Sequence, residues 1–268
     1  MGNVSLAAIY RDPHRVAVTA HRGFSGLWPE NTLPAFAAAI AAGADLIEFD
    51  LQPCREEIPV VMHDATVDRT TDGRSEISTI PLAALRELNA SWWEGSHAED
   101  GFRRTTPADP AARIPTFAEL LDAFAGRVGM NIHLKPNPSA AMLAEVCRLF
   151  HRHNLYASGY ISVNSYAEGV AVRQLDGHIP LCLLVGQNQM EAAALDQQKT
   201  FGVCCLQPGR NDVTPDFCAW ARSLDLPTNI FWANDPTTVE KFVAAGVQGL
   251  LTDWPDRVIA TLQRLGRR

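Results

Sequence analysis

Short apolar runs alternate with segments of helical periodicity along most of the chain. Runs typical of strands occupy residues 16–20, 46–51, 128–134, 160–163, 180–185, 203–207, 229–232 and 249–252. Segments typical of helices lie between many of them, at residues 140–150, 166–174, 190–196, 215–223 and 237–245. Eight alternating strand and helix units predict an α/β fold, a single-domain (β/α)₈ TIM barrel over residues 1–268.

A hairpin is expected beside the second strand. Residues 59–62 form a short apolar run that leads to His63 soon after Asp50. A parallel crossover needs about a dozen or more residues, and this connection is too short for one. We therefore predict an extended hairpin that folds His63 back beside Asp50.

The segment of residues 91–113 has no clear period of 2 or 3.6 and is rich in Trp, Gly, Pro and charge. In a barrel, such a stretch is expected to be an insertion beside the active-site face, and it is a candidate lid. Its aromatic residues would either wall a leaving-group pocket or fix the insertion to the barrel: Trp92, Trp93 and Phe102.

Residues suited to phosphoryl transfer stand at or near the ends of the first predicted strands. Glu48 and Asp50 alternate with an apolar residue, so both point to one face and can hold one hard cation. His21 and His63 each follow an apolar run and are candidate acid and base. Arg22 can bind phosphate oxygens as a fork, although a surface salt bridge is the alternative.

These residues stand in motifs that resemble those of the glycerophosphodiester phosphodiesterases. The densest matches are His21-Arg22-Gly23, Pro29-Glu30-Asn31-Thr32, Gly43-Ala44-Asp45-Leu46-Ile47-Glu48-Phe49-Asp50, His63-Asp64 and Arg69-Thr70-Thr71. Thinner matches continue at Ile114-Pro115-Thr116-Phe117, Trp232-Ala233-Asn234 and Thr252-Asp253-Trp254-Pro255. The resemblance implies a barrel enzyme, a phosphoric diester hydrolase, that uses one divalent metal ion, Mg²⁺ or Ca²⁺. It would hydrolyse a glycerophosphodiester to sn-glycerol 3-phosphate and an alcohol.

One position departs from the family pattern. Where the family has Glu-x-Lys, this chain has His133 and keeps Lys135 on the same face of the strand. His133 would serve as a metal ligand, with Mn²⁺, Co²⁺ or Zn²⁺ then possible because imidazole suits these ions. Alternatively, His133 contacts the phosphate while two carboxylates hold the metal, or metal binding is lost.

The resemblance also implies a role for each candidate residue. The cation, on Glu48, Asp50 and His133, would activate the glycerol 2-hydroxyl as the nucleophile. His21 is assigned as the base and His63 as the acid. The phosphate or substrate contacts are Arg22, Lys135 and Trp232, where Trp232 either stacks on the substrate or belongs to the core.

Composition limits the partners and the location. The net charge of −7 does not indicate a nucleic-acid or anionic-membrane surface, and no apolar run approaches the length of a membrane span. The six cysteines form no C-x-x-C pair and are expected to be free thiols in a reduced compartment. We expect a cytoplasmic protein with a small-molecule phosphodiester substrate, whose oligomeric state the sequence does not give.

Two other functions remain open. One is a related phosphodiesterase of the phospholipase type on the same barrel. The other is a phosphate-binding barrel without turnover, which lost its metal when Glu became His133. The retention of both His21 and His63 argues against the binder, because binding alone needs no paired acid and base.

Overall fold

The computed structural model of the protein describes residues 4–97, 99–185 and 192–268. Its strands are β1 (Ala17–His21), β2 (Leu46–Pro53), β3 (Pro59–Val61), β4 (Trp93–Glu94), β5 (Phe102–Arg103), β6 (Gly129–Leu134), β7 (Gly159–Val163), β8 (Leu181–Leu183), β9 (Asn229–Phe231) and β10 (Gly249–Thr252). Its α-helices are α1 (Leu6–Ile9), α2 (Leu33–Ala41), α3 (Leu82–Leu85), α4 (Phe117–Phe124), α5 (Ala140–Arg152), α6 (Tyr166–Leu175), α7 (Ala192–Phe201), α8 (Pro215–Ser223), α9 (Pro236–Ala245) and α10 (Pro255–Arg264). In these residues no helix is long and apolar enough to cross a membrane.

Side-chain caps define the first residue of several helices. Thr32, Ser139 and Asp235 each accept a backbone N–H from the first turn of α2, α5 and α9. Helix α4 begins with a capping box, in which the side chains of Thr116 and Glu119 each accept the other's backbone N–H. A side-chain cap at the first turn of a helix also fixes where the preceding loop ends. The loops that precede these helices carry polar residues of the site.

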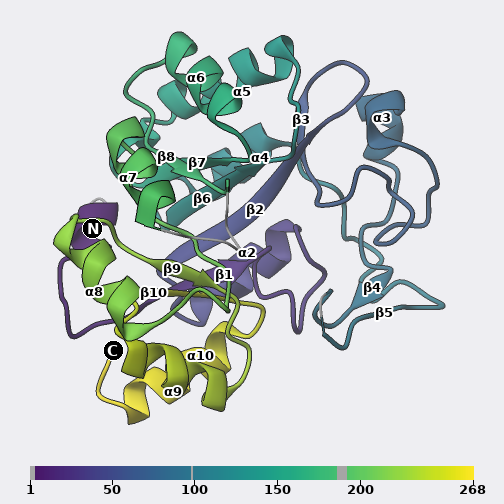
Figure 1. Cartoon of the computed structure of the whole chain (residues 1–268). Helices are drawn as coiled ribbons and strands as arrows, with labels where there is room; N and C mark the ends of the chain where they lie inside the picture. The colour runs from purple at the N-terminus through teal and green to yellow at the C-terminus, as the bar shows by residue number, and fades with distance from the viewer. Residues whose placement is uncertain (1–3, 98, 186–191) are drawn as a thin grey trace.

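The main sheet is built from parallel neighbours in the order β8-β7-β6-β2-β1-β10-β9, and β3 pairs antiparallel with β2. The sheet curls, and the longer helices lie around it (Figure 1). This arrangement is consistent with a TIM-like barrel and brings the carboxyl ends of the parallel strands to one face. The predicted hairpin is confirmed: Val61 pairs with Leu51, and the N–H of Met62 donates to the carbonyl of Asp50 at 3.0 Å.

The predicted strand at residues 203–207 does not form, so in the described part of the chain regular strands do not close the barrel. The segment still contacts both edges of the sheet. The N–H of Cys204 donates to β8, and the N–H of Leu206 donates to Pro227, each at 2.8 Å. Isolated parallel bridges join Leu206 to Thr228 and Gly209 to Phe231, and Pro208, which has no N–H to donate, lies between them.

The helix predicted at residues 190–196 is observed only in part. Its first two residues lie outside the described residues, and the described part belongs to α7, which extends to Phe201. All six cysteines are free, as predicted.

Strand β2 separates part of the apolar core from the polar residues of the site. Phe49 lies between Phe36 and Phe117, with ring centroids 5.9 Å away in both cases, and is fully buried. Burial of such a side chain contributes about 2–3 kcal/mol to the free energy of unfolding. Glu48 and Asp50 alternate with Phe49 and therefore point to the opposite face. The apolar contact thus fixes the direction of the two carboxylates.

Residues 91–113 contain a short antiparallel hairpin, in which Trp93 of β4 pairs with Arg103 of β5. The hairpin projects from the sheet on the same side of the molecule as α3 (Figure 1, right). Trp93 lies under Arg69, 5.0 Å from ring centroid to guanidinium, and Trp92 lies under Arg103 at 5.3 Å. The contact of Trp93 with Arg69 supports the alternative in which the tryptophans fix the segment to the barrel, whereas the contact of Trp92 lies within residues 91–113.

Candidate active site

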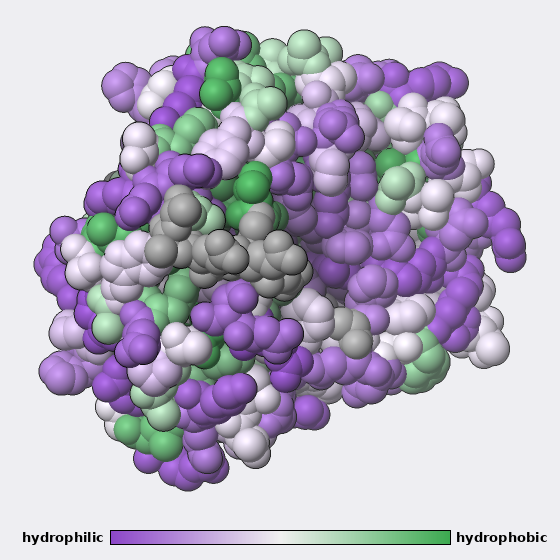
Figure 2. Space-filling model, in the orientation of Figure 1, coloured by the Kyte–Doolittle hydropathy of each residue, from purple (hydrophilic) through white to green (hydrophobic). Residues whose placement is uncertain are grey.

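The structure brings the eight residues selected from the sequence to the lining of one cavity of about 240 Å³. They are His21, Arg22, Glu48, Asp50, His63, His133, Lys135 and Trp232. They come from β1, β2 and β6 and from the segments that follow β1, β3, β6 and β9. Figure 2 shows hydrophilic residues around a hollow near the middle of the face that it presents.

His21 is held by Asp253, which directly follows β10. Its Nδ1 lies 2.6 Å from Asp253 Oδ1, and its Nε2 lies 3.9 Å from Glu48 Oε2. Asp253 also accepts hydrogen bonds from Ser25 Oγ, Ser96 Oγ and Asn234 Nδ2. Burial and the charge of Arg22 act to lower the pKa of His21, but Asp253 and Glu48 outweigh them and raise it.

His63 has an equivalent partner in its own neighbour. Its Nδ1 lies 2.6 Å from Asp64 Oδ1, and Arg69 Nε donates to the other oxygen of Asp64 at 2.7 Å. Burial is the largest effect and lowers the pKa of His63 to about 4, although the hydrogen bond to Asp64 acts to raise it. His63 is therefore neutral near pH 7, and Nε2 is the ring nitrogen available to a substrate.

Glu48, Asp50 and His133 form a candidate metal group, because one ligand atom from each lies within 4.8 Å of the others. The register of the sheet explains the cluster: Asp50 pairs with His133 across β2 and β6. His133 Nδ1 lies 3.0 Å from Asp50 Oδ1, and Lys135 Nζ lies 2.8 Å from the same oxygen. A side chain at residue 133 thus points to the carboxylates, as the sequence analysis expected.

The charges around this group fit one divalent cation. At Asp50, burial acts to raise the pKa, but Lys135 and His133 hold it well below its usual range. At Glu48, burial and the charge of Asp50 raise the pKa. Lys135 thus pairs with Asp50, whereas Glu48 accepts the N–H of Arg22 at 3.1 Å and lies 3.9 Å from His21 Nε2. Two carboxylates and an imidazole are donors that divalent ions accept.

Arg22 lies inside the site and is not a surface residue. It is 4% exposed, and its Nη1 donates to Glu30 Oε1 at 2.9 Å. Its buried Nε has no hydrogen-bond partner among the described residues and lies 3.5 Å from Asp50 Oδ2. A buried donor without a partner is rare, and here it is available to a phosphate oxygen. The next residue, Gly23, has φ +82°, and a Cβ there would lie 2.7 Å from the carbonyl carbon of Ala35.

A buried ion-pair network supports both histidine loops. Glu30 accepts hydrogen bonds from Arg22 and, through both oxygens, from Arg69 at 2.7 and 2.8 Å. Arg69 in turn binds Asp64, the partner of His63. Burial acts to raise the pKa of Glu30, but the two arginines lower it to about 2. The network connects the loop after β1 to the loop after β3.

We predict that Glu30→Gln lowers the free energy of unfolding at pH 7 by about 3 kcal/mol, because it leaves buried arginine charge without its partner. The pKa of Glu30 is lower in the folded chain, so its contribution is complete above its ordinary pKa of 4.5. That contribution is lost as the pH falls from 4.5 to about 2. Urea unfolding should therefore show that, as the pH falls from 4.5 to about 2, the free energy of unfolding decreases less in the variant than in the wild type.

The matched control is Glu87→Gln at an exposed residue, which should change the free energy of unfolding by less than about 0.5 kcal/mol. Equal unfolding curves for Glu30→Gln and the control would contradict the structural role of the network.

Among the described residues of segment 91–113, Ser96, His97 and Glu99 reach the site. Ser96 binds Asp253, and the ring of His97 lies 5.4 Å from that of His63 and lines the cavity. Glu99 accepts a hydrogen bond from Trp232 Nε1 at 3.3 Å. The indole of Trp232 is stacked with the imidazole of His21, with centroids 6.3 Å apart and planes 7° apart. Trp232 therefore lies at the site, and its indole bonds to Glu99 of segment 91–113.

Sequence reasoning missed Asp253 and His97. A signal existed for Asp253, because it directly follows the predicted strand at residues 249–252, where barrels place functional residues. Nothing in the aperiodic insertion distinguished His97 from its neighbours. Asp64 was visible only as part of a motif, and its hydrogen bond to His63 became evident from the structure.

Comparisons with known proteins agree with this site. The model of the Glycerophosphoryl diester phosphodiesterase family matches residues 21–257. The chain is 29% identical over 255 residues to a glycerophosphodiester phosphodiesterase of Bacillus subtilis, covering 91% of this chain and 85% of that protein.

Solved structures show the same fold. A Silicibacter pomeroyi protein has a TM-score of 0.83 at 24% identity, with 99% of both chains covered. An Oleispira antarctica phosphodiesterase, solved with its product sn-glycerol-3-phosphate, has a TM-score of 0.79 at 24% identity, covering 92% of this chain and 96% of that one. The match of the family model extends from His21 through Asp253 and so includes every residue of the site described above. The chain belongs to the glycerophosphoryl diester phosphodiesterase family, a family of phosphoric diester hydrolases.

Proposed function

We propose that this protein hydrolyses a glycerophosphodiester to sn-glycerol 3-phosphate and an alcohol, with a divalent metal ion and two histidines. The observation that carries the proposal is the arrangement of one cavity. Two aspartate-bound histidines, the group Glu48, Asp50 and His133, and an arginine with a free buried donor all line it. The product found in the Oleispira antarctica structure supports the substrate class.

The reaction begins with proton transfer from the glycerol 2-hydroxyl to one histidine, as the hydroxyl oxygen attacks phosphorus. The other histidine protonates the departing alkoxide as its bond to phosphorus breaks. This gives a cyclic 1,2-phosphate, which water opens with the two histidine roles reversed. Arg22 and Lys135 stabilise the charge that grows on the phosphoryl oxygens.

Asp253 and Asp64 are positioning residues for these steps. Each holds the Nδ1 of its histidine, which leaves Nε2 to transfer the proton. Glu48, Asp50 and His133 would hold the cation, which when bound supplies Lewis-acid polarisation of a phosphate oxygen. We further propose that residues 203–207 fill the eighth position of a (β/α)₈ barrel, and that residues 91–113 act as the lid of its single domain.

The assignment of the two histidines follows the sequence analysis, with His21 as base and His63 as acid. One observation favours the exchanged order: burial keeps His63 neutral near pH 7, ready to accept a proton. The geometry treats the two rings alike, because each has Nδ1 on an aspartate at 2.6 Å. Kinetics with different leaving groups decides between the two orders.

The experiment that tests the proposal is release of glycerol 3-phosphate from a panel of glycerophosphodiesters. Metal-stripped protein is assayed with Mg²⁺, Ca²⁺, Mn²⁺, Co²⁺ or Zn²⁺ added back. We expect turnover to depend on added metal, and Mn²⁺, Co²⁺ or Zn²⁺ to be most effective if His133 is a ligand. Absence of turnover with every metal and substrate would overturn the proposal and favour a phosphate-binding barrel.

A further inference from the structure

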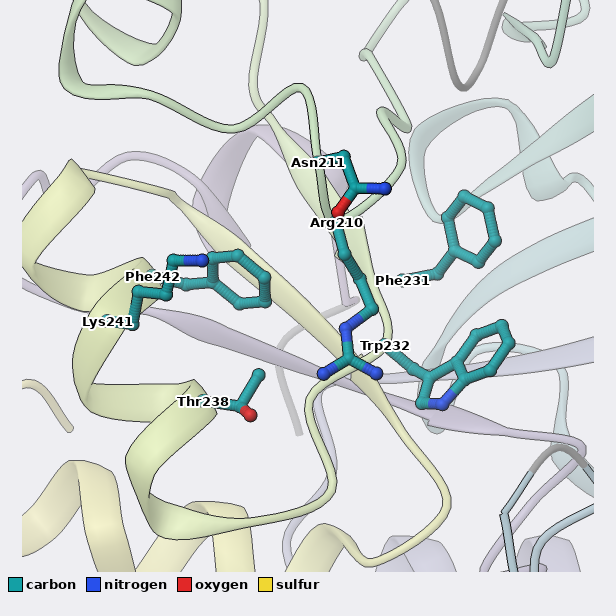
Figure 3. A pocket seen from close by; sticks show the side chains of 7 residues that line it. All are labelled: Arg210, Asn211, Phe231, Trp232, Thr238, Lys241 and Phe242. Carbon is teal, nitrogen blue, oxygen red and sulfur yellow. The ribbon is translucent and has the colours of Figure 1, made fainter.

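A second, larger cavity of about 460 Å³ adjoins the site and is not used by the chemistry proposed above. Its lining consists of Arg210, Asn211, Phe231, Trp232, Thr238, Lys241 and Phe242. Figure 3 shows the guanidinium of Arg210 between the indole of Trp232 and Thr238. The volume is within the range of small-molecule sites, about 300–1,000 Å³.

The two cavities share a wall. Phe231 and Trp232 line both of them, and Trp232 stacks with His21 on the side of the reaction site. The hydrogen bond from Trp232 Nε1 to Glu99 fixes the orientation of the indole. In the exchanged order of the two histidines, His21 protonates the leaving group, which would then pass along the indole into the second cavity.

The second cavity carries positive charge in a protein whose net charge is −7. Arg210 and Lys241 are both exposed, and among the described residues neither forms an ion pair within 4.0 Å. The carboxylate near Arg210 is Asp235, which already accepts hydrogen bonds from the N–H and hydroxyl of Thr238. Both cationic heads thus remain available to a ligand.

We propose that this cavity is a leaving-group subsite for an alcohol that carries an anionic group, a carboxylate or a phosphate. Arg210 binds the anionic group as a fork, and Lys241 adds a second positive charge. The apolar faces of Phe231 and Trp232 contact the carbon chain between the phosphodiester and the anionic group. This inference rests on the proposed function, since it names the substrates of that same site.

The test uses two matched pairs of substrates. Glycerophosphoserine and glycerophosphoethanolamine differ by a carboxylate, whereas glycerophosphoglycerol and its terminally phosphorylated form differ by a phosphate. For each pair, kcat/KM is measured for both substrates. The value for the substrate with the additional carboxylate or phosphate is divided by the value for the other. We expect a ratio of about 10 or more for at least one pair in the wild type, and the preferred pair identifies the anion.

Arg210→Gln combined with Lys241→Gln should bring that ratio close to 1. The control is Arg11→Gln combined with Arg74→Gln, which removes the same charge at exposed residues outside both cavities and should keep the wild-type ratio. A wild-type ratio of 1 or less for both pairs, with the other members hydrolysed, would overturn the subsite alone. An unchanged ratio in the Arg210 and Lys241 variant would also overturn it. Absence of hydrolysis of all four substrates would instead overturn the proposed function and this inference with it.

Discussion

His21→Ala and His63→Ala are each expected to lower kcat about 10³-fold, because each removes one of the two groups that transfer protons. The free energy of unfolding should fall by no more than about 2 kcal/mol in either variant. For His21→Ala, the reason is that Asp253 keeps three neutral donors after the imidazole is removed. Stopped or steady-state assays of glycerol 3-phosphate release measure kcat, and urea unfolding measures the free energy of unfolding. The control is His178→Ala, an exposed histidine outside the cavity, which should retain wild-type kcat.

The two variants differ in how they respond to the leaving group. An alcohol such as p-nitrophenol departs as a stable anion and needs no proton from an acid. The p-nitrophenyl ester of glycerol 3-phosphate should therefore restore turnover in the variant that lacks the acid. The variant that lacks the base should remain inactive. Recovery of His63→Ala would support the assignment of His21 as base, and recovery of His21→Ala would support the exchanged order. Full activity of both variants on ordinary substrates would contradict the two-histidine mechanism.

The part of the site on β1, β2 and β6 was predictable because strand periodicity and barrel topology together determine it. Alternation places Glu48 and Asp50 on one face, and the hairpin after β2 can only return His63 toward them. His133 was expected to face the same site, and the register confirms that it pairs with Asp50. These side-chain positions depend on which strands are neighbours in the sheet. The order of the strands along the chain already restricts those neighbours.

Contacts between distant loops were not predictable by the same reasoning. Asp253 meets His21 only because β10 pairs with β1, and its bond to Ser96 depends on the path of an aperiodic insertion. The segment at residues 203–207 has the apolar pattern of a strand, but among the described residues Leu206 pairs with Thr228 only as an isolated bridge. Local pattern predicts which segments prefer to be strands, whereas the hydrogen bonds available from their neighbours decide whether they pair.

The cavity beside the site could not be predicted from the sequence either. Arg210 and Lys241 lie on a loop and on α9, with no motif in common, and their proximity arises from the three-dimensional arrangement. Trp232 alone carried a sequence signal, and that signal could not distinguish a substrate contact from a core residue. The structure places it between two cavities, so its indole is a wall shared by the reaction site and the candidate leaving-group subsite.

Glu48→Gln should remove metal-dependent turnover, with a loss of metal affinity greater than the roughly 10- to 100-fold typical for residues that only support a ligand. The reason is that the variant keeps the shape of the side chain but replaces a charged oxygen donor in a group of three. A readout independent of activity is thermal unfolding with added metal, because a ligand that binds the folded state raises Tm as its concentration exceeds Kd. The rise seen for the wild type should be absent in Glu48→Gln and present in the exposed control Glu87→Gln.

The companion variant His133→Glu should behave in the opposite way. It supplies a third carboxylate beside Asp50, where the imidazole now lies 3.0 Å from Oδ1. Hard cations prefer oxygen donors, so Mg²⁺ and Ca²⁺ should stabilise this variant more than the wild type, relative to Mn²⁺, Co²⁺ and Zn²⁺. The same order of metals in variant and wild type would show that His133 is not a ligand and would favour its role as a phosphate contact. Metal-dependent stabilisation that survives Glu48→Gln would place the cation outside this group, because the variant lacks one of the group's two carboxylates.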